Sequence, residues 1–253
     1  MSFFAVPADA YDRFMGRYSV QLSPQLADLA GVTAGQKVLD VGCGPGALTA
    51  ELVARVSAAN VSAVDPSPTF VEAARSRHPG VDVQQASAES LPFTDEAFDA
   101  SLAQLVVHFM ADPLAGVTEM ARVTREGGMV AACVWDHGGG RGPLSLFWEA
   151  VAEIDPNAEN ESHLAGSRDG DLVRLLQAAG LHDVEQTVMS APVEHATFDA
   201  FWEPFTHSVG PAGTYAAGLD PDRLATLRAL CRARIPSEPF TIDARAWAAR
   251  GRR

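Results

Sequence analysis

The chain of 253 residues contains little lysine and a strong excess of acidic residues. Lys37 is the only lysine, and the formal net charge is −13 at pH 7. Because a chain this acidic repels the phosphates of nucleic acids, we expect no nucleic-acid partner. The arginines at positions 250, 252 and 253 are expected to form a solvated tail and not a binding arm.

Cysteines are also few, and the three present are far apart in the sequence, with no spacing typical of a metal site or a redox motif. The histidines show no ligand spacing either, so we predict no metal site. The start of the chain lacks the pattern of a signal peptide, and apolar stretches such as 100–110 are too short to span a bilayer. We therefore expect a cytoplasmic protein with no membrane partner and no disulfides.

From residue 36 to residue 135, short apolar strands alternate with helices. We predict strands at 38–41, 61–64, 81–85, 98–103 and 129–134, helices at 47–56, 69–77 and 113–123, and a turn at 127–128. This alternation predicts an α/β fold, in which a doubly wound, mostly parallel sheet carries helices on both faces.

The flanking regions read as decorations of one domain that covers residues 1–253. Residues 1–35 form a helical entry segment, predicted as helices 8–15 and 20–30 with a break at Gly16. The C-terminal half predicts helices at 144–154, 171–179, 197–207 and 221–234 and strands at 182–189 and 240–248, the last at a sheet edge. Segments 136–168 and 192–236 are candidates for a helical lid that sets substrate specificity.

The strongest motif is a strand at 38–41 that runs into the turn Gly42-Cys43-Gly44-Pro45-Gly46, which opens a helix. Glycines allow a ligand to approach the backbone closely, and the free N–H groups of a helix start favour negative ligand groups. Asp65 ends the next strand, where a carboxylate can accept hydrogen bonds from both hydroxyls of a ribose. The pattern predicts a nucleoside-containing cofactor at the switch point of the sheet.

Two classes of cofactor share this arrangement. Gly42, Gly44 and Ala47 satisfy the dinucleotide fingerprint, which would indicate an NAD(P)-dependent oxidoreductase. Against this, Asp40 aims a carboxylate into the turn, which suits an ammonium group better than a pyrophosphate. Lys37 lies beside the first strand, so a Tyr-x-x-x-Lys catalytic site is excluded. A protein that holds its cofactor without catalysis is a third reading.

The glycine turn resembles the first motif of class I methyltransferases, and later segments resemble the following motifs in order. These are residues 61–67, residues 86–93 with Phe98-Asp99, and residues 119–123 with Gly127-Gly128. Together they match the ubiquinone/menaquinone-biosynthesis-like (type 11) methyltransferases over about residues 10–135. The resemblance implies a Rossmann-like, seven-stranded sheet with an antiparallel last strand. It also implies methyl transfer from S-adenosylmethionine to a small-molecule acceptor.

The resemblance further implies roles for single residues. Asp40, Gly42 and Gly44 should line the methionine part of the cofactor, and Gln104 should approach the same end. Asp65 should bind the ribose, with Pro66 and Ser67 beside the adenosine. Ala88 and Glu89 should lie near the adenine. The family usually has an aspartate where this chain has Ser87, and serine is a weaker, uncharged acceptor.

Methyl transfer needs a general base only when the nucleophile arrives protonated. His108 is the best candidate because it follows the fourth strand, on the edge where ligands bind; the alternative interpretation is that it packs in an apolar loop beside Val107 and Phe109 or shapes the pocket. Asp136 and His137 follow the fifth strand and face the same crevice, where capping a loop is as good an interpretation as catalysis. Other candidates for the site are Tyr11 and Arg17, which could close over the cofactor, and Phe201, Trp202 and Phe205, which could line an apolar pocket or form core.

Overall fold

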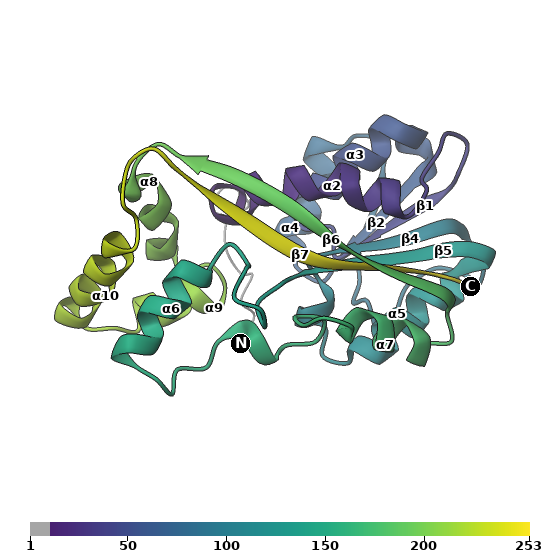
Figure 1. Ribbon diagram of the computed structural model, residues 1–253. Coiled ribbons are helices and arrows are strands. Elements are labelled where there is room, and N and C mark those ends of the chain that lie inside the picture. The colour runs from purple at the N-terminus through teal and green to yellow at the C-terminus, as the bar shows by residue number, and fades with distance from the viewer. Residues whose placement is uncertain (1–10) are drawn as a thin grey trace.

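The computed structural model describes residues 11–253, which contain one seven-stranded sheet (Figure 1). The strands are β1 Val38–Val41, β2 Val61–Asp65, β3 Asp82–Gln85, β4 Phe98–Gln104, β5 Thr124–Trp135, β6 His182–His195 and β7 Phe240–Arg252. Their order is β3-β2-β1-β4-β5-β7-β6, and β7 runs in the direction opposite to the other six strands. The predicted doubly wound, mostly parallel sheet with an antiparallel last strand is confirmed.

Helices cover both faces of this sheet (Figure 1). One face carries α2 Arg17–Leu29, α3 Ala47–Val56 and α4 Pro68–Arg77, and the other carries α5 Pro113–Val123 and α7 Asp171–Ala178. The central strand β1 is buried along its whole length because helices cover it on both sides. Its short, continuous apolar run is therefore the pattern expected of a parallel strand inside such a sheet.

The antiparallel pair of β6 and β7 extends beyond the rest of the sheet, and a group of helices lies at its far end (Figure 1). This cap consists of α6 Ser145–Ile154, α8 Phe198–Trp202, η5 Glu203–His207, α9 Gly210–Ala217 and α10 Pro221–Ala233. Phe147 stacks on Phe205 with ring centroids 4.6 Å apart, and Phe201 and Trp202 pack edge-on or tilted against Phe205. The aromatic residues of this segment thus form the core of the cap.

Several predicted boundaries were wrong. The strand at the sheet edge is β6, and β7 is an inner strand between β5 and β6. Residues 127–128 lie inside β5, where the pairing with β4 shifts between Phe98 and Ala100, as in a β-bulge. Residues 192–195, predicted within a lid segment, belong to β6.

The entry segment also differs from its prediction. The π-helix η1 Asp12–Gly16 continues directly into α2, so Gly16 does not break the chain into two helices. The part of the first predicted helix that precedes Tyr11 lies outside the described residues. Short 3-10 helices at Ala58–Asn60 (η2), Val107–Phe109 (η3) and Glu161–His163 (η4) complete the list of elements. None of the helices over residues 11–253 has the length and apolar character that crossing a bilayer requires.

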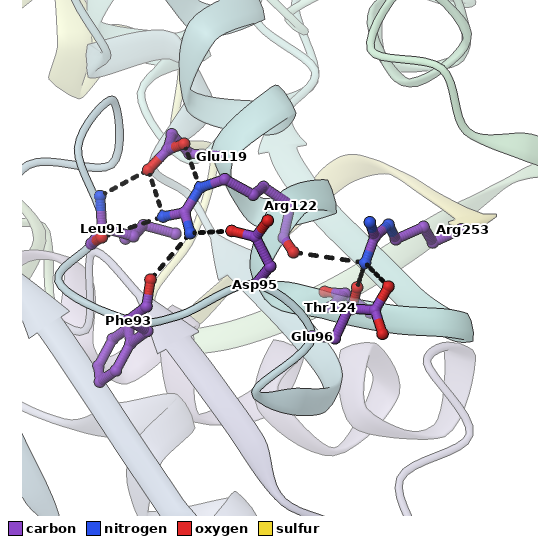
Figure 2. Close-up of polar contacts among 8 residues, drawn as sticks. All are labelled: Leu91, Phe93, Asp95, Glu96, Glu119, Arg122, Thr124 and Arg253. Atoms are coloured by element: carbon purple, nitrogen blue, oxygen red, sulfur yellow. Dashed lines mark hydrogen bonds and ion pairs between the residues drawn. The ribbon is translucent and has the colours of Figure 1, made fainter.

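The C-terminal arginines do not form a solvated tail. Arg250 lies in β7 and pairs with Glu185 at 2.7 Å. Arg253 donates to the main-chain oxygens of Arg122 and Thr124 and pairs with Glu96 at 3.2 Å (Figure 2). The end of the chain is therefore fixed against the start of β5.

Arg122 in turn fixes the loop that follows β3 (Figure 2). Its guanidinium pairs with Glu119 at 2.6 Å and with Asp95 at 2.8 Å. It also donates to the main-chain oxygens of Leu91 and Phe93. This loop carries residues 87–89, which line the cavity of about 640 Å³ in the candidate site described next.

Candidate cofactor and acceptor site

A cavity of about 640 Å³ lies at the carboxyl ends of β1, β2 and β4. The predicted cofactor contacts that line it are Gly42, Gly44, Asp65, Pro66, Ser67, Ala88, Glu89 and Gln104. Asp40 lies deeper, on an adjoining cavity of about 30 Å³ that shares Gly42, Gly44 and Gln104 with the first. The structure therefore brings all the predicted cofactor residues together around two connected spaces.

The glycine turn has backbone geometry that side chains would not tolerate. Gly42 has φ +70°, and a Cβ atom there would lie 2.4 Å from Cγ2 of Val106. Gly44 has φ +53°, and its Cβ would meet no atom within 4 Å. Gly42 is thus required for packing, whereas the missing side chain of Gly44 leaves the turn open toward the cavity.

Asp65 holds this turn in place from the end of β2. Its carboxylate accepts the backbone N–H of Gly44 at 2.9 Å and that of Ser67 at 2.8 Å. Burial raises the pKa of Asp65, and these two hydrogen bonds oppose the rise. Because a carboxylate oxygen can accept more than one hydrogen bond, Asp65 retains acceptor capacity toward a ligand in the cavity.

Asp40 and Gln104 each present an acceptor without a partner among residues 11–253. Oδ2 of Asp40 accepts a hydrogen bond from Thr49 at 2.6 Å, but Oδ1 is buried and unpaired. Nε2 of Gln104 donates to the main-chain oxygen of Ser19 at 3.1 Å, while Oε1 is unpaired. Burial raises the pKa of Asp40 to about 7, and the side chain is only 1% exposed. Buried acceptors rarely lack a donor, so this pair indicates a missing cationic or N–H-bearing ligand.

Ser87 and Glu89 form a local network beside the cavity. The hydroxyl of Ser87 donates to Oε2 of Glu89, and Oε1 of Glu89 accepts the backbone N–H of Ala111 at 2.8 Å. Burial alone would raise the pKa of Glu89, but these hydrogen bonds outweigh it and lower the pKa. Glu89 therefore joins two loops at the cavity wall as an ionised carboxylate.

The entry segment covers the glycine turn. Tyr11 lines the large cavity, the small cavity beside Asp40 and a third space described below. Arg77 of α4 pairs with Asp12 at 2.7 Å and donates to the main-chain oxygen of Pro45. Arg17, predicted to close over the cofactor, instead lies 3.3 Å from Nδ1 of His195 on β6.

His108 and His137 lie on a separate chamber of about 30 Å³ that shares Tyr11, Leu105 and Phe109 with the large cavity. Nδ1 of His108 and Nε2 of His137 are buried without a hydrogen-bond partner in the described chain, and the rings are 5.9 Å apart. Burial lowers the pKa of His108 well below its usual value, with a smaller effect from His137. Burial also lowers the pKa of His137, to about 4, so both rings are neutral near pH 7. Asp136 accepts the backbone N–H of Gly139 and caps the loop.

Glu161 is a further polar residue of this chamber that the sequence did not reveal. It is 4% exposed, and Nε1 of Trp148 donates to its Oε2 at 2.7 Å. Burial raises its pKa to about 7. Glu161 lies in a polar stretch that reads as a solvated loop, and no motif marks it.

Comparisons with known proteins agree with this architecture. A family model described as a methyltransferase domain matches residues 39–132. A demethylmenaquinone methyltransferase of Clavibacter sepedonicus is 32% identical over 73% of this chain and 77% of its own length. An uncharacterised protein of Mycobacterium tuberculosis is 30% identical over 79% of this chain and 77% of its own length. The crystal structure of YcgJ from Bacillus subtilis superposes with a TM-score of 0.60 at 20% identity, covering 91% of this chain and 97% of that one.

The chain therefore belongs to the class I S-adenosylmethionine-dependent methyltransferases, within the ubiquinone/menaquinone-biosynthesis-like (type 11) family. It is an enzyme that transfers methyl groups. Membership of this family decides against the NAD(P)-dependent oxidoreductase and against the non-catalytic binding protein, both of which the glycine turn alone had left open.

Proposed function

We propose that the chain binds S-adenosylmethionine across the two connected cavities and methylates a small molecule held in the chamber beside His108. The observation that carries this proposal is the pair of unpaired acceptors, Oδ1 of Asp40 and Oε1 of Gln104, next to the glycine turn. Two buried acceptors with no donor suit the ammonium group of the methionine part of the cofactor.

The remaining residues fit the other parts of the cofactor. Asp65 ends β2 with acceptor capacity directed at a ribose diol, and Pro66 and Ser67 continue the same wall. Ala88 and Glu89 lie across the cavity on the adenine side. A cavity of about 640 Å³ falls within the range typical of sites for small organic ligands.

When bound, S-adenosylmethionine supplies a methyl group that its positively charged sulfur already activates for displacement. The residues of this chain then have three tasks: to hold the acceptor in line, to exclude water and to receive a proton. His108 is neutral, and in the tautomer that carries its proton on Nε2 the unpaired Nδ1 can accept a proton from an acceptor in the chamber. Tyr11, Leu105 and Phe109 line both the chamber and the cofactor cavity, so the two spaces adjoin at these residues.

The helical cap and the loop before it serve as the lid over the acceptor. Segments 136–168 and 198–233 supply His137, Leu144, Glu161 and Val209 to the chamber wall. We assign substrate specificity to these segments because the cofactor side of the cavity is formed by the sheet and the entry segment.

The variant Asp65→Asn tests the cofactor assignment. We expect it to weaken binding of S-adenosylhomocysteine by roughly 10- to 100-fold, because the amide nitrogen that replaces one acceptor oxygen cannot accept a hydrogen bond from a ribose hydroxyl. Asp82→Asn, an exposed carboxyl at the start of β3, is the matched control and should bind normally. Unchanged affinity in a folded Asp65→Asn protein, measured by titration calorimetry, would show that the ribose lies elsewhere.

A further inference from the structure

The chamber beside His108 shares part of its wall with a second, wider cavity. This outer cavity of about 260 Å³ lies between α6 and η4 and is lined in part by Ser145, Trp148, Ala152 and Asn160. His137 and Glu161 line both the outer cavity and the chamber. The two spaces therefore adjoin at these two side chains, whereas the chamber and the cofactor cavity share Tyr11, Leu105 and Phe109.

The size of the two spaces limits what each can hold. The chamber, at about 30 Å³, has room for one small functional group, whereas the outer cavity can hold a ring. The chamber walls are apolar apart from Tyr11, His108, His137 and Glu161. An acceptor that enters from the outer cavity would thus extend one polar group past Glu161 toward His108.

Three side chains of the chamber have polar atoms that no hydrogen bond from residues 11–253 occupies. Trp148 occupies Oε2 of Glu161, and Oε1 accepts no hydrogen bond from the described residues. Nδ1 of His108 and Nε2 of His137 are also unpaired, and each can accept a hydrogen bond in the tautomer that carries its proton on the other ring nitrogen. Among residues 11–253, no lysine or arginine lines the chamber, so none of these residues there would neutralise an anionic acceptor.

We propose that Glu161 and His137 form the acceptor gate, which admits an uncharged molecule with a hydroxyl group that the enzyme methylates on oxygen. The inference rests on the proposed function, since it assumes that the cofactor occupies the large cavity. A hydroxyl keeps a lone pair while it donates a hydrogen bond, so it can face these acceptors and still attack. An ammonium group would pair with Glu161 but would have no lone pair until it lost a proton.

The transfer step balances with residues already present. The acceptor oxygen forms a bond to the methyl carbon while the carbon–sulfur bond breaks, and sulfur keeps that electron pair. The hydroxyl proton passes to Nδ1 of His108, so the positive charge lost at sulfur appears on the imidazole and then leaves with the proton into solvent. No oxidant or metal is needed.

The test uses small probes that differ only in the group offered to the gate. The full chain is first saturated with S-adenosylhomocysteine, and phenol, anisole, benzoate and benzylamine are then titrated while tryptophan fluorescence reports binding near Trp148. We expect phenol to bind with a dissociation constant of about 1 mM and at least tenfold more tightly than the other three.

Two variants separate the gate from the fold. In Glu161→Gln the single amide oxygen is taken by Trp148, so phenol affinity should fall about tenfold while the affinity for S-adenosylhomocysteine is unchanged. Ala152→Trp narrows the outer cavity from an exposed position on α6 and should have the same effect. Ala225→Trp, exposed on α10, is the control and should change neither affinity.

Each other outcome refutes a defined part of the proposal. Tighter binding of benzylamine than of phenol would overturn the hydroxyl assignment. Equal affinity for phenol and anisole, or unchanged phenol affinity in both variants, would overturn the role of Glu161. Absence of phenol binding in the saturated protein would overturn the acceptor route, whereas failure to bind S-adenosylhomocysteine at the start would refute the proposed function itself.

Discussion

Replacing Asp40 by asparagine should weaken cofactor binding and at the same time stabilise the fold. Asp40 is 1% exposed, and burial raises its pKa from 3.8 to about 7. The unfolded chain therefore loses this proton at lower pH than the folded chain, and the stability of the wild-type protein falls as pH rises from about 4 to 7. Above pH 7 the ionised carboxylate lowers the unfolding free energy by up to about 4 kcal/mol, because the pKa difference between the folded and unfolded chains sets the size of this loss.

Asparagine has nearly the same shape and no charge to bury. We expect Asp40→Asn to have a higher unfolding free energy than the wild type at pH 8, by up to about 4 kcal/mol, and nearly the same value at pH 4. Loss of the carboxylate leaves the ligand ammonium without its partner, which should cost about 3 kcal/mol or more, or roughly 100-fold in affinity.

Urea unfolding at pH 4 and pH 8, together with calorimetric titration of S-adenosylhomocysteine, measures both effects. Glu72→Gln on the exposed side of α4 makes the same change in net charge and should alter neither quantity. If Asp40→Asn were less stable than the wild type at pH 8, or bound the ligand equally well, the argument from an unpaired buried carboxylate would be wrong.

Three further predictions concern packing. Gly42→Ala should lower the unfolding free energy by roughly 2–4 kcal/mol in urea titrations because its Cβ overlaps Val106. Gly44→Ala should lower it by only about 1 kcal/mol, yet it should reduce the affinity for S-adenosylhomocysteine measured by calorimetry. Equal losses of stability in the two variants would contradict the difference in contacts between the two glycines. Arg122→Ala should lower stability by about 2–3 kcal/mol and expose the 91–95 loop to limited proteolysis, and unchanged proteolysis would count against the network of Figure 2. Phe147→Ala should destabilise the cap by about 3–5 kcal/mol in thermal unfolding, and a loss below 1 kcal/mol would mean that the stacked pair is not its core.

The sequence predicted the cofactor half of the molecule well because that half is built from local signals. Short apolar runs become strands buried on both faces, and the glycine turn requires backbone angles that other residues avoid. Asp65 could be located because a residue at the end of a parallel strand always lies at the ligand edge.

The acceptor half depends on contacts between distant segments. In β7 the inward positions are small alanines at 244, 246 and 248, and the half-buried Arg245 and Trp247 alternate with them, so the strand reads as an exposed edge. It is an inner strand because β6 pairs along its whole length, and no local pattern reveals that pairing. Glu161 was missed for the same reason, since its burial depends on Trp148 of α6 and not on its neighbours in sequence.

The helix α9 illustrates a third limit. Gly210–Ala217 contains two glycines and a proline, a composition that disfavours a helix on propensity alone. Packing within the cap stabilises the helix, with Ala212 and Ala216 fully or nearly buried. Tertiary contacts thus override a weak local preference in this segment.

The most direct test of the central claim is calorimetric titration of the purified chain with S-adenosylhomocysteine, and separately with NAD and NADP. The account predicts saturable binding of S-adenosylhomocysteine at one site per chain, weakened in Asp40→Asn and in Asp65→Asn, and no heat from either dinucleotide. Binding of a nicotinamide dinucleotide without binding of S-adenosylhomocysteine would contradict the account of the glycine turn and of the methyl-transfer site built on it.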